Sequence, residues 1–259
     1  MNDDALIGYT GFVGGNLRRQ CPFGCMFNSK NIHEMRGRRF SRIVCAGVNA
    51  VKWLANKEPE KDLAGIQALL DVLETVTADE AILVSTVDVF AEPVGVDEDS
   101  DPYASGDLHP YGRHRLMVET FFRARFPSLV VRLPGLFGDG LKKNIIFDFL
   151  HDNNVNQINS HAVYQFYNLD HIYRDIMRSR TAGLRLVHFA TAPVSVRSVA
   201  LTVFGIEFTG GDEHNAVRYD MQTKHAELWG RKRHINTRQE SLQEIKDFCE
   251  RERAKAHHV

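Results

Sequence analysis

The feature that most constrains this chain is a glycine-rich turn directly after its first apolar segment. Residues 5–7 (Ala-Leu-Ile) are apolar, and Gly8, Gly11 and Gly14 follow at intervals of three. Glycine permits a tight turn, lets backbone N–H groups approach a pyrophosphate, and lets a helix pack closely on a strand. A helix that begins there presents unpaired N–H groups and partial positive charge to an anion. The turn predicts a dinucleotide site formed by Gly8, Gly11, Phe12, Val13 and Gly14; a glycine-rich surface turn is the alternative.

The composition narrows the class of protein. A chain of 259 residues with 43% hydrophobic and 25% charged residues fits one α/β domain, or a nucleotide-binding domain with a smaller cap. A formal net charge of -1 gives no reason to expect a nucleic acid or an anionic membrane as partner. No apolar run approaches the roughly 18 residues of a membrane span, and the acidic start at residues 2–4 (Asn-Asp-Asp) is unlike a signal peptide. We therefore expect a cytoplasmic protein with no membrane partner.

Cysteine and histidine spacing predicts no metal site. The four cysteines show no CxxC pattern and are expected to be small buried thiols: Cys21, Cys25, Cys45 and Cys249. No His, Cys and Asp residues have the spacing of metal ligands.

Short apolar segments alternate with segments of helical spacing along the chain. Strands are expected near residues 25–28, 42–48, 81–86, 129–133 and 184–189, and helices near 59–76, 110–119 and 241–253. This alternation predicts an α/β fold, a Rossmann-type doubly wound parallel sheet that binds its ligand at the carboxyl ends of the strands. We expect residues 1–140 plus about 160–205 to form the NAD(P)-binding domain. Residues of about 141–159 and 206–259 would form a small C-terminal α/β substrate-binding cap.

The residues that end the second and third expected strands indicate which cofactor the chain binds and how closely the backbone approaches it. An acidic side chain about 20 residues beyond the glycine turn grips the adenosine ribose of NAD. Here the residues are Asn28, Ser29 and Lys30, none of them acidic. Ser29 and Lys30 can accept a 2′-phosphate, so NADP is favoured over NAD; a solvated basic loop is the alternative. The third strand ends in Ala46 and Gly47, whose small side chains suit a close approach of backbone to cofactor.

Four motifs follow one another in the first 140 residues. They are the glycine turn, residues 85–90 (Ser-Thr-Val-Asp-Val-Phe), residues 110–115 (Pro-Tyr-Gly-Arg-His-Arg) and residues 132–138 (Arg-Leu-Pro-Gly-Leu-Phe-Gly). In this order they resemble the extended short-chain dehydrogenase/reductase family, the NAD-dependent epimerase/dehydratase group that includes dTDP-4-dehydrorhamnose reductases. Residues 166–172 are a weaker match to the family's segment near the substrate.

The resemblance implies a catalytic set of Tyr111, Thr86 and Arg115. In the family, the Tyr of a Tyr-xxx-Lys pair is the general acid/base, and a Ser or Thr hydrogen-bonds the substrate oxygen. A Tyr with a pKa of about 10 is a weak base at neutral pH, and moving it three units takes roughly 4 kcal/mol. A cation one helical turn away can supply this stabilisation. Arg115 occupies the Lys position, with the same charge but a planar fork of donors. The alternative for Tyr111 is an amphipathic core residue with its hydroxyl at the surface.

Further site residues are implied by the same resemblance. Ser85, Tyr111, Arg115 and Pro134 would also contact the cofactor, and Asp88, Asn144 and Tyr164 would join Thr86 at the substrate. The family's dehydratases have Asp-Glu after the Thr, whereas this chain has Val87 and Asp88, which disfavours dehydration. Tyr164 stands where the family has an Arg that clamps a nucleotide diphosphate, and a neutral Tyr cannot replace that bidentate contact.

The sequence thus predicts an NAD(P)-dependent reductase, dehydrogenase or epimerase that acts on a sugar nucleotide or a related sugar carbonyl. The alternative is a catalytically weakened NAD(P)-binding regulator or scaffold, suggested by Arg115 and Tyr164. The resemblance also implies a homodimer that pairs through a helix bundle containing the Tyr111 helix. His109 and His114, on either side of Tyr111, are expected at the surface; contact with the substrate is the alternative.

Overall fold

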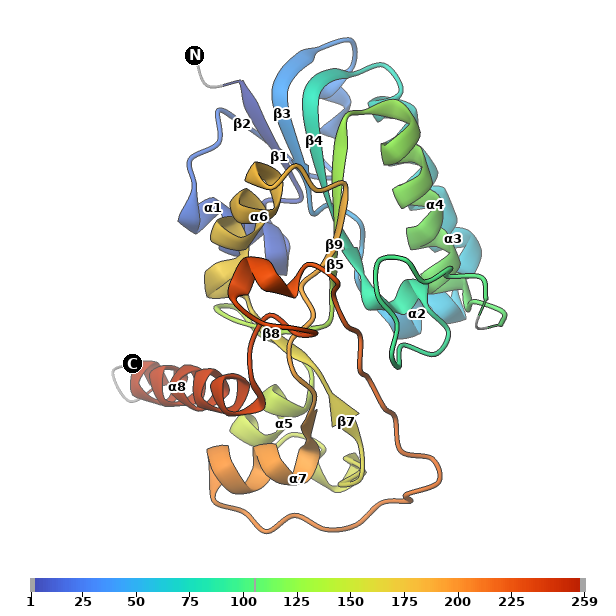
Figure 1. The fold of residues 1–259 in the computed structure, drawn as a ribbon. Helices are drawn as coiled ribbons and strands as arrows, with labels where there is room; N and C mark the ends of the chain where they lie inside the picture. The colour runs from blue at the N-terminus through green and yellow to red at the C-terminus, as the bar shows by residue number, and fades with distance from the viewer. Residues whose placement is uncertain (1–2, 105, 257–259) are drawn as a thin grey trace. The chain divides into compact units, whose positions relative to one another are not determined.

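The computed structural model describes residues 3–104 and 106–256, which fall into two compact units (Figure 1). The first unit consists of Met1–Glu92, Ser100–Leu133 and Asp170–Val187. The second consists of Pro93–Asp99, Pro134–Leu169 and His188–Val259. The stretch 160–205, expected to lie in the NAD(P)-binding domain, is divided between them.

The first unit is built on a six-stranded sheet with the order β2-β1-β3-β4-β5-β9. The strands are β1 (Asp4–Ile7), β2 (Cys25–Phe27), β3 (Arg39–Cys45), β4 (Thr77–Thr86), β5 (Ser128–Leu133) and β9 (Leu186–His188). The pairs β1–β2, β1–β3, β3–β4 and β4–β5 are parallel, with Ile7 opposite Cys45 and Cys45 opposite Leu83. The predicted doubly wound parallel sheet is confirmed. Its order reverses between β1 and β3, which is the switch point where such sheets bind ligands.

Helices cover both faces of this sheet. The helices α1 (Phe12–Gln20) and α6 (Ile172–Thr181) lie together on one face, and α3 (Pro59–Leu73) and α4 (Pro110–Arg125) on the other (Figure 1). The short helix α2 (Lys52–Lys57) follows β3, and the 3-10 turns η1 (Ile32–Met35) and η2 (Val87–Val89) follow β2 and β4. Ile66, Leu70 and Leu73 of α3 recur at helical spacing and are buried against the sheet.

The outer edge of the sheet at β2 is short. Rossmann sheets of the order 3-2-1-4-5-6 continue beyond this position with one more strand. In this chain the link from β2 to β3, residues 28–38, contains only η1. Within the described residues β2 is therefore the edge strand, and the order matches the 2-1-3-4-5 variant of the doubly wound sheet.

Up to residue 256, where the described residues end, the second unit combines two small sheets with three helices. Strand β6 (Gly135–Phe137) pairs in parallel with β8 (Phe166–Asn168), and β7 (Val163–Tyr164) pairs antiparallel with β10 (Val194–Ser195). The helices are α5 (Ile145–His151), α7 (Val196–Val199), which continues as the π-helical η5 (Ala200–Phe204), and α8 (Arg238–Ala256). Remaining short turns are η3 (Val155–Gln157), η4 (Leu169–His171) and η6 (Ala226–Trp229). Phe137, Ile146, Phe166, Ile245 and Phe248 form its core.

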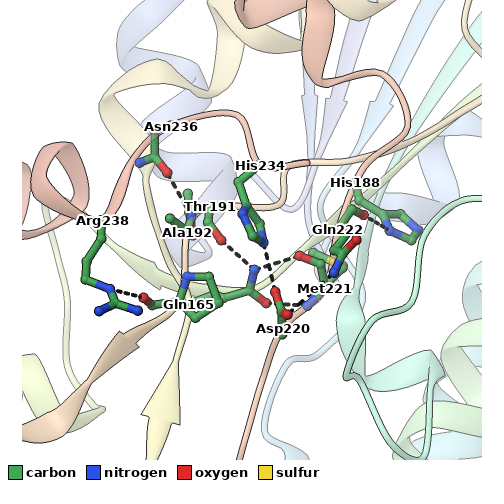
Figure 2. A network of polar contacts seen from close by, with 11 residues as sticks. Gln165, His188, Thr191, Ala192, Asp220, Met221, Gln222, His234, Asn236 and Arg238 are labelled. Carbon is green, nitrogen blue, oxygen red and sulfur yellow. Dashed lines mark hydrogen bonds and ion pairs between the residues drawn. The ribbon is translucent and has the colours of Figure 1, made fainter. Parts of the chain in front are cut away.

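A buried glutamine ties distant segments of the second unit together (Figure 2). The Gln165 amide nitrogen donates to the carbonyl oxygens of Thr191 at 2.5 Å and Met221 at 2.7 Å. Its amide oxygen accepts from the N–H of Met221 at 2.7 Å. Gln165 is 1% exposed, so these bonds replace those that water would make to the three backbone groups. Beside it, His234 Nε2 lies 2.8 Å from Asp220 Oδ1.

All four cysteines are free thiols, with Cys21, Cys45 and Cys249 buried and Cys25 half-buried. Over the part of the chain that the structure describes, each helix is too short or too polar to cross a bilayer.

Candidate active site

The glycine turn lies against the end of β3. Gly8 has a φ of 86°, and a Cβ there would lie 2.5 Å from the Ala46 carbonyl oxygen. A Cβ on Gly14 would lie 2.1 Å from the Gly8 carbonyl oxygen, and one on Gly47 would lie 2.7 Å from Ile7 Cγ2. Real Cβ atoms do not approach so closely, so the backbone of the turn and of the loop after β3 meet only because these residues lack side chains.

The turn leads directly into the N-terminus of α1. Gly11 is the exposed N-cap, and Phe12, Val13 and Gly14 open the helix. Their N–H groups have no acceptor within the helix. The first turn contains no acidic residue that would compete with an anion. This arrangement fits a pyrophosphate by charge and by hydrogen bonding.

Asn28, at the end of β2, forms hydrogen bonds that stabilise the turn that follows. Its side-chain oxygen accepts from the N–H of Lys30 at 2.9 Å, and its own N–H donates to the Asn31 side chain at 2.8 Å. Ser29 and Lys30 are exposed. This turn therefore offers a hydroxyl and an ammonium, but no carboxylate, to an approaching ligand.

Tyr111 and Thr86 meet although they are 25 residues apart in the sequence. Helix α4 begins at Pro110, a position that suits proline. The Tyr111 N–H donates to the Asn56 side chain at 3.0 Å, and a Cβ on Gly112 would lie 2.1 Å from the Asp88 carbonyl oxygen. These close contacts hold the start of α4 against α2 and against η2, which follows β4. The Tyr111 side chain is buried, and its interaction with the Thr86 side chain lowers the pKa of the phenol.

Arg115 is held by a carboxylate that the sequence analysis did not single out. Its Nη1 lies 2.5 Å from Asp62 Oδ2 and its Nη2 lies 3.0 Å from Asp62 Oδ1, and Nη2 also donates to the Asn49 carbonyl oxygen. His114 Nδ1 lies 2.8 Å from Asp62 Oδ2. The expectation that His114 is a surface residue is wrong, because it is 7% exposed and packs on this carboxylate. Arg115 is 4% exposed, and its guanidinium carbon lies 4.1 Å from the centroid of the Tyr111 ring.

The electrostatic surroundings raise the pKa of the Tyr111 phenol. Burial is the largest cause, since it penalises the phenolate. The positive charge of Arg115 lowers this pKa, and the negative charge of Asp88 raises it further. The phenol therefore holds its proton at neutral pH, as a proton donor must.

Asp88 forms an ion pair with Lys52 next to Thr86. Lys52 Nζ lies 2.8 Å from Asp88 Oδ1, and Asp88 Oδ2 lies 3.5 Å from Thr86 Oγ1. The Asp88 N–H also donates to Thr86 Oγ1 at 3.1 Å. The sequence held one hint of this pair, since Lys52 closely follows the small-residue end of the third strand.

Ser85 faces the other side of β4 from Thr86, as alternation along a strand requires. Its hydroxyl donates to Glu119 Oε1 at 2.6 Å. Glu119 is in turn paired with Arg132, whose Nη2 lies 2.7 Å from Glu119 Oε2. Ser85 is thus part of a buried ionic cluster.

Three of the predicted site residues belong to the second unit. Pro134 is buried and is the first residue of the segment Pro134–Leu169 of that unit. The Asn144 side chain caps α5, accepting from the N–H groups of Ile146 at 3.0 Å and Phe147 at 3.2 Å. Tyr164 is half-buried, with its ring centroid 6.0 Å from that of Tyr219, and burial raises the pKa of its phenol.

Solved structures share this fold over nearly the whole chain. A dTDP-4-dehydrorhamnose reductase from Clostridium acetobutylicum has a TM-score of 0.72 at 14% identity, covering 95% of this chain and 98% of that one. The UDP-glucose 4-epimerase of Thermotoga maritima has a TM-score of 0.71 at 14% identity, covering 98% and 99%. MoeE5, solved with UDP-glucose and NAD, has a TM-score of 0.70 at 16% identity, covering 96% and 99%. No protein-family model and no curated protein sequence matches the chain. At these identities the likeness establishes the fold.

Proposed function

We propose that this chain is an NAD(P)-dependent reductase, dehydrogenase or epimerase that acts on a sugar nucleotide or a related sugar carbonyl. The interaction of the buried Tyr111 phenol with the Thr86 side chain, beside the Arg115 guanidinium 4.1 Å from the ring centroid, carries the proposal. Thr86 is the last residue of β4, at the sheet edge where the glycine turn follows β1. Residues 46–51 contact both places, since Ala46 and Gly47 lie against Gly8 while Asn49 accepts from Arg115. Shared fold adds support, because MoeE5 binds UDP-glucose and NAD.

The described residues fit a dinucleotide. The N-terminus of α1 would hold the pyrophosphate, with Ala46 and Gly47 leaving room beside it. Ser29 and Lys30 would hold a 2′-phosphate, which favours NADP over NAD. When bound, the nicotinamide supplies or accepts the hydride.

Tyr111 and Thr86 would then handle the substrate oxygen. The Thr86 hydroxyl orients this oxygen, and the Tyr111 hydroxyl donates its proton as the carbonyl becomes an alcohol. The raised pKa of Tyr111 favours this direction, since a buried phenolate is costly as a base. Reduction is therefore the direction that these surroundings support best.

The test is the variant Tyr111→Phe. Turnover is followed by nicotinamide absorbance on a panel of keto-sugar nucleotides, and cofactor binding by thermal shift. We expect at least about a 100-fold loss of turnover with unchanged cofactor binding. Tyr103→Phe is the matched control, since Tyr103 is 68% exposed in the same unit. Full activity of Tyr111→Phe would refute the assignment. Cofactor binding by the unmodified protein without turnover on any substrate would favour the catalytically weakened regulator.

We also propose a homodimer that pairs through α3 and α4. A surface hollow between these helices is lined by Leu70, Met117 and Phe121 together with Gln67, Glu74 and Arg113. Light scattering tests this directly, and a monomer at micromolar concentration would exclude the proposal.

A further inference from the structure

Two ion pairs lie near the Tyr111 phenol: Arg115–Asp62, with Arg115 4.1 Å from the ring centroid, and Lys52–Asp88, with Asp88 next to Thr86. Arg115 of α4 is neutralised by Asp62 of α3, with two nitrogens on the two carboxylate oxygens. Asp88 of η2 is neutralised by Lys52 of α2. The first pair is a single buried unit, so the positive charge one turn beyond Tyr111 is already matched. The second pair contacts Thr86, whose side chain interacts with the phenol.

The Lys52–Asp88 pair is built to orient Thr86. One Asp88 oxygen receives Lys52 at 2.8 Å, and the other lies 3.5 Å from Thr86 Oγ1. The Asp88 N–H donates to the same Oγ1 at 3.1 Å. The Asp88 side chain is 17% exposed and that of Lys52 is 38% exposed, so the ammonium forms the solvent-facing end of the chain of contacts.

We propose that Lys52 is a positioning residue for Tyr111 that acts through Asp88 and Thr86. Lys52 lies on a different helix, α2, and supplies the ammonium group that the Tyr-xxx-Arg sequence lacks. The inference rests on the proposed function, because it assigns a further role at the same site. Lys52 acts by charge and by position, and its own proton stays in place. Its positive charge offsets the negative charge of the Asp88 carboxylate next to Thr86. Through Asp88 it also fixes the orientation of the Thr86 side chain relative to the phenol.

The physical consequence is a change in the pKa of Tyr111 when Lys52 is removed. Without the Lys52 charge, the negative charge of Asp88 disfavours a nearby phenolate more strongly, and a shift of about one pKa unit is typical for such a charge. The other charged or titratable groups around the phenol are Arg115, Asp62 and His114, together with His109 at the N-cap of α4. None of these changes in a Lys52 variant, so the shift isolates the lysine.

The experiment compares Lys52→Met, Lys52→Arg, Asp88→Asn and the double variant Lys52→Met/Asp88→Asn. The phenolate absorbance of each is titrated by stopped-flow pH jump, with the same variant carrying Tyr111→Phe subtracted so that the difference reports Tyr111 alone. Lys57→Met is the matched control, because Lys57 is an exposed lysine on the same helix. The pH profile of turnover is recorded in parallel.

We expect Lys52→Met to raise the pKa of Tyr111 by about one unit, and Lys52→Arg to restore it. The double variant should return close to the unmodified value, since it removes both charges, and Lys57→Met should change nothing. An unchanged Tyr111 titration in Lys52→Met overturns the proposal, whatever the turnover. A shifted titration with no turnover on any substrate instead supports Lys52 and refutes the proposed function, so the two failures are distinct.

Discussion

The guanidinium of Arg115 lies over the face of the Tyr111 ring, with its central carbon 4.1 Å from the ring centroid. A planar fork needs acceptors in its own plane, and it finds them in the Asp62 carboxylate and the Asn49 carbonyl. The cation therefore lies against the ring face, whereas the hydroxyl contacts Thr86. This arrangement explains why burial outweighs the nearby charge and keeps the pKa of Tyr111 above its ordinary value.

Asp62→Asn tests how much the buried pair depends on its carboxylate. The substitution preserves shape but leaves the Arg115 guanidinium, 4% exposed, without a counter-ion. Breaking a buried pair in this way costs about 3 kcal/mol of unfolding free energy. Urea denaturation measures the loss. The variant should also lower the pKa of Tyr111, since one of the negative charges that raise it is removed.

The effect of Asp62→Asn on the free energy of unfolding should depend on pH. Burial raises the pKa of the Asp62 carboxyl, but Arg115 and His114 lower it more, so it lies below the ordinary 3.8. A carboxyl with a depressed pKa stabilises the fold above its ordinary pKa and loses that contribution as the pH falls through the depressed value. The stability gap between the unmodified protein and Asp62→Asn should therefore narrow below about pH 3.8. Glu60→Gln, an exposed change on the same helix, is the control; a gap independent of pH would contradict the assignment.

Two adjacent glycines in α1 give a matched pair of variants. In Gly14→Ala the new Cβ would lie 2.1 Å from the Gly8 carbonyl oxygen, so the turn must open. We expect a loss of about 3 kcal/mol in stability together with weaker cofactor binding. In Gly15→Ala the nearest atom lies 3.9 Å away, and alanine favours a helix over glycine by up to about 1 kcal/mol. Thermal unfolding with and without cofactor measures both, and equal effects of the two variants would be inconsistent with a close-packed turn.

Much of the sheet could be predicted because its strands are short apolar runs between helical segments. Strands β3 and β4 nevertheless begin earlier than expected, at Arg39 and Thr77. Charged residues interrupt the apolar pattern there, but Arg39 pairs with Asp79 at 2.5 Å across the two strands. The strand order was not predictable in detail, because it depends on which edge each connection crosses. The short link through residues 28–38 leaves β2 at the edge of the sheet. This edge position cannot be predicted from the residues of the link or of the strand.

The site was predictable only where short motifs carry it. Tyr111 and Thr86 belong to such motifs, and the structure brings them into contact. The partner of Arg115 lies 53 residues earlier in the sequence, where Asp62 reads as a solvated charge in the first turn of a helix. Long-range pairs of this kind depend on helix packing, since α3 and α4 must lie side by side before the contact exists.

The buried ion pair of Glu119 and Arg132 tests whether buried charge stabilises this fold. Glu119 is 1% exposed and Arg132 is 2% exposed, and both Arg132 Nε and Nη2 donate to Glu119, at 3.0 Å and 2.7 Å. Glu119→Gln should cost about 3 kcal/mol, because it removes the carboxylate charge that both Arg132 and Arg123 contact. The double variant Glu119→Leu/Arg132→Met should recover most of this loss, since buried pairs are often replaceable by apolar residues. Equilibrium denaturation decides the matter, and additive losses in the double variant would show that the two side chains are not coupled.

Asn144 combines a strained backbone with a helix cap. Its φ of 115° and ψ of 175° fall in a region nearly confined to glycine, at a typical cost of about 1–3 kcal/mol. Its side chain offsets this by accepting from Ile146 and Phe147 and by donating to the Leu136 carbonyl oxygen at 2.9 Å. Asn144→Ala keeps the strain and loses the cap, whereas Asn144→Gly loses the cap and relieves the strain. The alanine variant should therefore be the less stable by about 1 kcal/mol or more in urea denaturation. If Asn144 also contacts substrate, as the sequence predicts, the glycine variant will lose turnover while it remains folded; equal stability of the two variants would instead show that the backbone relaxes once the cap is gone.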